Sequence, residues 1–130
     1  MQFSPKLIFP AISLGFFSAS VLNINNIRDI ESDTKAGKKS IPVRIGRAAA
    51  VRYNWFLVIA GNFALLLFVV MEQAWGGLLA LFMAPVMIKI AQAVSDKRKT
   101  SSQIDPYLKK MAIFTLVWVM AFGAGIIFLK

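Results

Sequence analysis

The chain has 130 residues, enough for one domain, of which 58% are hydrophobic and 16% are charged. Soluble domains are about half apolar and a quarter charged, so this composition indicates a protein of the lipid bilayer. The net charge of +9 does not indicate nucleic acid as a partner, because the basic residues cluster between apolar runs instead of among aromatic residues.

The composition also limits which metals could bind. The chain contains no cysteine and no histidine, which excludes disulfides, thiolate and imidazole metal sites, and a Ser-His-Asp triad. Any bound metal must therefore be held by oxygen ligands, which favours magnesium, calcium or manganese.

Four apolar segments are long enough to cross the hydrocarbon core of a membrane, which takes about 20 residues of helix. We expect these helices at about 7–33, 53–71, 76–95 and 107–129. The sequence therefore predicts an all-α integral membrane protein with four transmembrane helices, forming a single transmembrane domain over 1–130.

The loops between these helices predict their orientation. The loop 25–52 and the loop before the fourth helix are rich in lysine and arginine, whereas the turn between the second and third helices carries only Glu72 as a charged residue. Lysine and arginine are enriched on the cytoplasmic side of membrane proteins. We therefore expect a multi-pass protein of the inner (cytoplasmic) cell membrane, with the loop 25–52 facing the cytoplasm and both chain ends on the other side.

A polar face is predicted where the first helix reaches the cytoplasmic boundary. Asn25, Asp29 and Asp33 recur at every fourth residue, so they share one face of a helix. The two aspartates lie about 6 Å apart along the axis at 1.5 Å per residue, which lets both carboxylates reach one divalent ion, or two ions bridged by a ligand. Glu31 points away from this face and is expected to face solvent.

A turn rich in lysine follows the polar face. Gly37 is expected to end the helix, so that Lys38 and Lys39 fold back toward the carboxylates. Carboxylates, amides and lysines together at a membrane boundary suit a magnesium-complexed diphosphate with an apolar tail. Oxygen ligands hold the metal, and cations hold the diphosphate. Two aspartates four residues apart are alone a weak signal, since acids near bases usually form a solvated helix face. The combination favours a binding site.

These residues resemble a known motif. The segment 25–46 reads N-N-I-R-D-x-x-x-D-x-x-x-G-K-K-S-x-x-V-R-x-G and resembles the second aspartate-rich motif of the UbiA-type intramembrane prenyltransferases. It is most similar to the branch of that family that acts on 1,4-dihydroxy-2-naphthoate in menaquinone synthesis. A weaker match is the segment 104–110, which resembles the start of the family's last helix. Asp105 stands there in place of the commoner asparagine and is given no role.

The resemblance implies a particular part of a larger fold. Family members have nine transmembrane helices with two aspartate-rich motifs, each of which binds one magnesium ion. The chain resembles helices six to nine, and the first motif, N-D-x-x-D-x-x-x-D, is absent from it. The resemblance therefore implies that Asp29 and Asp33 supply half of a two-metal site. The chain alone is then expected to be incomplete, and it would need a missing N-terminal half or a partner chain.

The resemblance also implies the reaction and the residues that carry it. The reaction is transfer of a polyprenyl chain from an allylic polyprenyl diphosphate to 1,4-dihydroxy-2-naphthoate, with loss of CO2 and with Mg2+ as the cofactor. Asp29 and Asp33 are the implied catalytic and metal-binding residues. Arg28 is expected to contribute less, because helical spacing turns it off the aspartate face. The implied substrate-binding residues are Asn25, Asn26, Lys38, Lys39 and Arg44.

Two alternative functions stay open at this point. The first is a catalytically inactive fragment whose polar loop merely faces the cytoplasm. The second is a small four-helix transporter or assembly protein. Proton-coupled transporters usually carry an acid within a membrane helix, and here only Lys89 lies near membrane depth, so transport is the weaker alternative.

Overall fold

The computed structural model describes residues 5–129. Its elements, in chain order, are η1 (Pro5–Leu7), α1 (Ile8–Arg28), α2 (Ile30–Ala36), α3 (Ile41–Ile45), α4 (Arg47–Glu72), the 3-10 helix η2 (Trp75–Met83), α5 (Ala84–Val94) and α6 (Ser101–Phe128). Four segments are long and apolar enough to cross a membrane, namely Pro5–Arg28, Arg47–Glu72, Trp75–Val94 and Ser101–Phe128. No strand occurs in the described part of the chain, so the predicted all-α, four-helix class is confirmed.

The first helix is interrupted where the sequence predicted one helix over 7–33. The structure ends α1 at Arg28 and begins α2 after Asp29, whose φ of −97° and ψ of 10° depart from α-helical values. The interruption is small, because the Asp33 backbone N–H still donates to the Asp29 carbonyl at 2.7 Å. The polar segment therefore follows α1 directly as a separate short helix at the end of the bundle.

The second and fourth membrane helices begin before the predicted 53–71 and 107–129. The fourth starts early because Thr100 and Gln103 form a capping box, in which the Gln103 side chain accepts the Thr100 backbone N–H at 2.9 Å. The second begins at Arg47. Hydropathy marks only the part of a helix that lies in the hydrocarbon, whereas the helix itself continues into the polar boundary.

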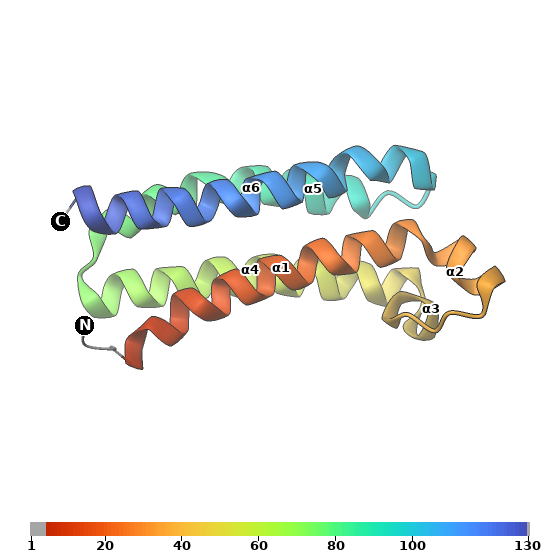
Figure 1. The fold of residues 1–130 in the computed structure, drawn as a ribbon, viewed down its shortest axis with the longest axis horizontal. Coiled ribbons are helices and arrows are strands. Elements are labelled where there is room, and N and C mark those ends of the chain that lie inside the picture. The colour runs from red at the N-terminus through yellow and green to blue at the C-terminus, as the bar shows by residue number, and fades with distance from the viewer. Residues whose placement is uncertain (1–4, 130) are drawn as a thin grey trace.

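The helices form two antiparallel pairs (Figure 1). In the figure, α1 lies along α4, and α6 lies along η2 and α5, while α2 and α3 form one end of the bundle. The core between the pairs is mostly aliphatic, with an aromatic cluster around Trp118. Trp118 meets Phe17 edge-on at 5.4 Å between ring centroids and stacks on Phe122 at 5.5 Å, and such pairs stabilise a core beyond the area that they bury.

Buried polar contacts set the register of α1 against α4. The Ser20 hydroxyl donates to the Asn54 side-chain oxygen at 2.6 Å, and the Asn23 amide donates to the Ala50 carbonyl at 2.9 Å. In a membrane, helices associate through close packing and through such hydrogen bonds rather than through apolar burial alone. These contacts lie just before the polar segment and therefore fix the position from which it leaves the bundle.

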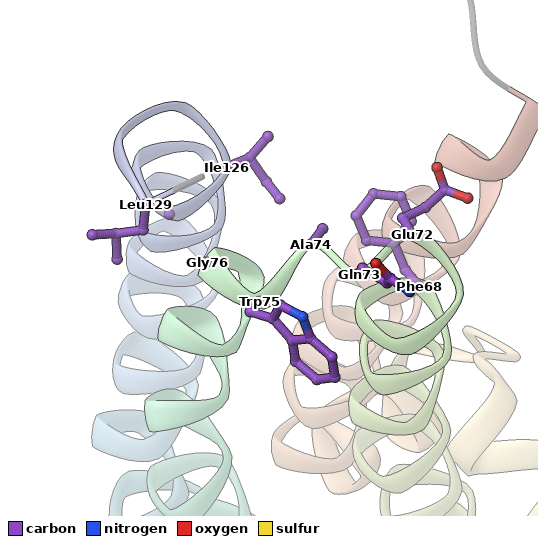
Figure 2. A pocket seen from close by; sticks show the side chains of 9 residues that line it. Phe68, Glu72, Gln73, Ala74, Trp75, Gly76, Ile126 and Leu129 are labelled. Carbon is purple, nitrogen blue, oxygen red and sulfur yellow. The ribbon is translucent and has the colours of Figure 1, made fainter.

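The opposite end of the bundle contains the turn from α4 into η2. Figure 2 shows Trp75 and Phe68 beside a cavity of about 380 Å³, with Gly76 next to the last turns of α6. Glu72, at this end, binds the Lys6 ammonium at 2.6 Å. None of the residues predicted to form the site lines this cavity.

Candidate functional site

The predicted motif lies at the end of the bundle formed by α2 and α3 (Figure 1). Gly37 ends α2 with a left-handed φ of 77°, as predicted. The Lys38 N–H donates to the Asp33 carbonyl at 2.9 Å, and the Gly37 N–H donates to the Thr34 carbonyl at 3.2 Å. These two bonds are the Schellman arrangement that satisfies the last carbonyls of a helix. The chain therefore reverses direction after Asp33, and Lys38 lies beside the acidic residues.

A second glycine, Gly46, joins α3 to α4. Its φ of 87° and ψ of 156° belong to a region that is essentially restricted to glycine. We expect Gly46→Ala to lower the free energy of unfolding by about 1–3 kcal/mol, measured by thermal unfolding in detergent. Gly15→Ala is the matched control, because its added methyl group meets nothing within 4 Å. Equal stability of the two variants would contradict a strained junction at Gly46.

Arg28 lies at the centre of the site. Its Nε donates to Asp29 Oδ1 at 2.9 Å, and its Nη2 donates both to Asp29 Oδ2 at 3.2 Å and to Asn25 Oδ1 at 2.8 Å. Its Nη1 donates to Asp105 Oδ1 at 2.6 Å. The expectation that helical spacing turns Arg28 off the aspartate face is therefore wrong, because the long side chain folds back over the break at Asp29.

The contact with Arg28 changes the acidity of Asp29. The hydrogen bonds from the Arg28 guanidinium hold the pKa of Asp29 below its ordinary value, and the positive charge of Lys38 acts in the same direction. A lowered pKa keeps the carboxylate ionised through the neutral range. The stability that this pair contributes is present above the ordinary pKa and is lost as the pH falls through the lowered one.

This arrangement leads to a titration prediction. We expect Arg28→Gln to raise the pKa of Asp29 toward its ordinary value, because the largest cause of the shift is removed. Carbon-13 NMR of the aspartate carboxyl groups measures the change directly, and Arg28→Lys should retain part of the shift. An Asp29 titration that is identical in wild type and in Arg28→Gln would mean that the guanidinium does not act on this carboxylate.

Asp105 is a site residue that the sequence reasoning missed. It binds Arg28 through Oδ1 and Lys109 through Oδ2, the latter at 3.2 Å. One turn earlier in α6, the Ser101 hydroxyl donates to the Arg28 carbonyl at 2.7 Å. The start of α6 therefore holds the end of α1 in place through an ion pair and a hydrogen bond. The sequence did hold a signal for this role, because Asp105 places a charge where the family's pattern has asparagine.

Asp33 presents the acceptor best placed for a ligand. Its Oδ2 atom is buried and has no hydrogen-bond partner within residues 5–129, although buried carboxylate oxygens are normally satisfied. The same part of the chain contains no group of three or more acidic, histidine or cysteine side chains that could hold a metal ion. The described residues thus offer a metal ion only the two carboxylates of Asp29 and Asp33. Such a pair is what one half of a larger metal site would provide.

The remaining predicted residues lie at the same end of the bundle and differ in their exposure. Asn26 is half-buried and makes no side-chain hydrogen bond in the described part of the chain. Lys38, Lys39 and Arg44 are exposed, and the Arg44 Nε donates to the Lys39 carbonyl at 2.9 Å, which folds the loop before α3. Structure and prediction therefore agree that these residues share one end of the bundle.

Glu31 occupies the opposite side of α2, as predicted. Its side chain is 80% exposed and binds Lys35, one helical turn later, at 3.3 Å. It is therefore a solvent-facing acid and separate from the pair formed by Asp29 and Asp33.

Comparison with known proteins gives the family of the chain. The family model described as "UbiA prenyltransferase family" matches residues 1–116, which include the whole segment from Asn25 to Gly46. The chain belongs to the UbiA prenyltransferase family. Together with the four apolar spans, membership makes it a multi-pass membrane protein, and no solved structure matches it significantly.

Curated relatives within the UbiA family share one name, 1,4-dihydroxy-2-naphthoate octaprenyltransferase. The relative from Escherichia coli is 36% identical over 124 residues, which are 94% of this chain and 40% of the relative. The relative from Haemophilus influenzae is 34% identical over 93% of this chain and 39% of its own length. The relative from Mycobacterium tuberculosis is 33% identical over 91% of this chain and 39% of its own length. The chain therefore spans about two fifths of the length of the curated relatives it matches. This share agrees with the expectation that it corresponds to four of nine helices.

Proposed function

We propose that the chain forms half of the diphosphate site of a prenyltransferase that acts on 1,4-dihydroxy-2-naphthoate. The observation that carries the proposal is the pair of Asp29 and Asp33 at the end of a membrane helix, with a buried Asp33 oxygen that lacks a partner. The shared name of the relatives supports the acceptor and the polyprenyl donor.

The donor set of this site fits magnesium. The described residues provide oxygen ligands only, which are the ligands that magnesium prefers. Asp33 Oδ2 would take a place in the coordination shell without breaking an existing hydrogen bond, whereas both oxygens of Asp29 already accept from Arg28. When bound, magnesium supplies positive charge that neutralises a diphosphate leaving group. Asp33 is therefore the primary metal ligand of the proposal, and Asp29 is the ligand that Arg28 orients.

The other residues of the segment hold the organic substrate. Lys38, Lys39 and Arg44 supply positive charge for the diphosphate, and as exposed side chains they can move onto it. Asn25 and Asn26 supply amide groups at the boundary between the polar loop and the apolar helices. The polyprenyl tail then extends away from these charges into the membrane, where apolar surface is available.

The proposed reaction balances as a substitution at an allylic carbon. The carbon–oxygen bond of the polyprenyl diphosphate breaks, and its electron pair leaves with the diphosphate. An electron-rich ring carbon of 1,4-dihydroxy-2-naphthoate forms the new carbon–carbon bond. Carbon dioxide departs, and the electron pair of its bond remains with the ring. The cations around Asp29 and Asp33 stabilise the negative charge that develops on the leaving diphosphate.

The proposed setting is the inner (cytoplasmic) membrane, with the motif end in the cytoplasm. The basic loops lie at the end of the bundle that carries α2 and α3 (Figure 1), and lysine and arginine are enriched on the cytoplasmic side. In this proposal, the half of the site that carries the family's first aspartate-rich motif comes from an N-terminal half or a partner chain, because that motif is absent from this sequence.

A prenyl-transfer assay tests this function. Membranes holding the chain together with a segment that provides the family's first aspartate-rich motif receive labelled polyprenyl diphosphate and carboxyl-labelled 1,4-dihydroxy-2-naphthoate. We expect a prenylated naphthoquinol and an equal amount of labelled carbon dioxide, both lost on addition of EDTA. Transfer to 4-hydroxybenzoate but not to the naphthoate would contradict the acceptor, and no transfer to either would favour an inactive fragment.

A further inference from the structure

A cationic hollow opens between the start of α4 and the end of α5. It has a volume of about 410 Å³, and none of its six lining residues is acidic or belongs to the predicted site. We call it the cationic hollow, and its lining residues are Arg47, Ala48, Val51, Arg52, Ser95 and Lys97. It lies at the same end of the bundle as the other basic loops.

Two of the three cations of the hollow are exposed and available to a ligand, and the third also holds the neighbouring loop. Arg52 and Lys97 are exposed and form no ion pair within residues 5–129. Arg47 donates through its two Nη atoms to the carbonyls of Asp96 and Lys99, at 3.0 and 3.3 Å, whereas its buried Nε has no partner. Because α4 begins at Arg47, the positive end of the helix dipole adds to the same field.

A separate apolar groove lies deeper in the bundle, between the same two helices. It has a volume of about 260 Å³, and its lining residues are Val58, Ile59, Asn62, Phe63, Leu66, Ala84 and Ile88. Residues 51, 55, 58 and 62 of α4 follow helical spacing, so hollow and groove lie on one face of that helix. Trp55 stands between them and donates its Nε1 to the Ser95 hydroxyl at 2.9 Å.

The depth of the groove matches the hydrocarbon of one leaflet. At 1.5 Å per residue, Ile59 lies about 10 Å and Leu66 about 20 Å beyond Arg52 along α4. Half of a hydrocarbon core is about 15 Å thick. A ligand whose charged group lies at Arg52 would therefore reach the groove with a tail that stays mostly within the same leaflet.

We propose that the cationic hollow and the groove together bind one anionic phospholipid, whose phosphate lies among Arg47, Arg52 and Lys97 and whose acyl chain follows Ile59 and Ile88. Charge complementarity identifies the occupant, because three cations with no acid among the lining residues favour an anion over a zwitterionic headgroup. A basic pocket between membrane helices is a known form of lipid headgroup site. The site uses none of the proposed catalytic residues, so it stands or fails independently of prenyl transfer.

Native mass spectrometry of the protein in neutral detergent tests the lipid site. We expect one dioleoyl-phosphatidylglycerol molecule to remain bound under conditions that remove dioleoyl-phosphatidylcholine, and inorganic phosphate should not displace it. The double variant Arg52→Gln, Lys97→Gln should bind the anionic lipid about 30-fold more weakly. Each cation removed near a membrane surface lowers the affinity roughly fivefold, and the two factors multiply. Arg47 is left in place because it also holds the loop before α6.

Two further variants make the result specific. Lys109→Gln, Lys110→Gln removes the same charge from α6 outside the hollow and should leave binding unchanged. Ile88→Trp fills the groove without changing the charge and should weaken binding of the lipid. Circular dichroism checks that each variant is helical. Equal loss of affinity in both lysine-containing double variants would overturn the site, as would unchanged affinity in Arg52→Gln, Lys97→Gln. Displacement of the lipid by phosphate alone would overturn the role of the groove.

Discussion

Asp33→Asn is expected to lower the rate of prenyl transfer by about 10²–10³-fold. The substitution keeps the shape of the side chain but removes the charge of a carboxylate whose buried oxygen has no partner among the described residues. Asp29→Asn should have an effect of similar size, and it also removes the charge that Arg28 pairs with. Initial rates with labelled polyprenyl diphosphate, measured over a range of magnesium concentrations in the assembled enzyme, check both expectations.

Glu31→Gln is the matched control for the aspartate variants. It removes the same charge from the same short helix, but its side chain is 80% exposed and pairs with Lys35 on the helix surface. We expect its rate to stay within about twofold of wild type, in line with the small effect of an exposed ion pair. Wild-type rates for Asp33→Asn at limiting magnesium, or an equal loss for Glu31→Gln, would remove Asp33 from the metal site.

Gly125→Ala is expected to have the largest effect on stability. A methyl group at this position would meet the carbonyl oxygen of Gly76, and one at Gly76 would meet the carbonyl oxygen of Gly125. Backbone atoms cannot turn aside as a flexible side chain can, so η2 and α6 would have to separate. Overpacking of this kind costs about 3 kcal/mol, and denaturation of the purified protein in detergent measures it.

Gly123→Ala provides the comparison on the same helix. A methyl group there meets nothing within 4 Å, and alanine favours a helix over glycine by about 1 kcal/mol. We therefore expect Gly123→Ala to be neutral or slightly stabilising while Gly125→Ala unfolds readily. If both variants kept wild-type stability, the close approach of the two backbones would not be needed for the fold.

The fold was predictable from the sequence because the membrane imposes a simple pattern. Apolar runs of membrane length marked all four spans, and the turn at Gly37 followed from glycine's tolerance of a left-handed φ. The ends of the helices were not predictable from hydropathy. The helix that begins at Arg47 has charged residues in its first two turns, and these lower the hydropathy without preventing the helix.

The sequence predicted which end of the bundle carries the candidate residues, but it did not predict the hydrogen bonds and ion pairs among them. Helical spacing predicted that Asp29 and Asp33 share one helix face, whereas the break at Asp29 and the reach of the Arg28 side chain decide which groups touch. The contact between Arg28 and Asp105 joins residues 77 positions apart. Helical periodicity describes neighbours within one helix and carries no information about such a partner on another helix.

The most direct test of the central claim is electron paramagnetic resonance of the chain with manganese in place of magnesium. With farnesyl diphosphate present, we expect a bound manganese signal that shows coupling to phosphorus-31. The signal should persist in Glu31→Gln and be lost in Asp33→Asn, because Asp33 offers the free buried carboxylate oxygen. A phosphorus-coupled signal that is unchanged in Asp33→Asn would place the metal elsewhere and contradict the account.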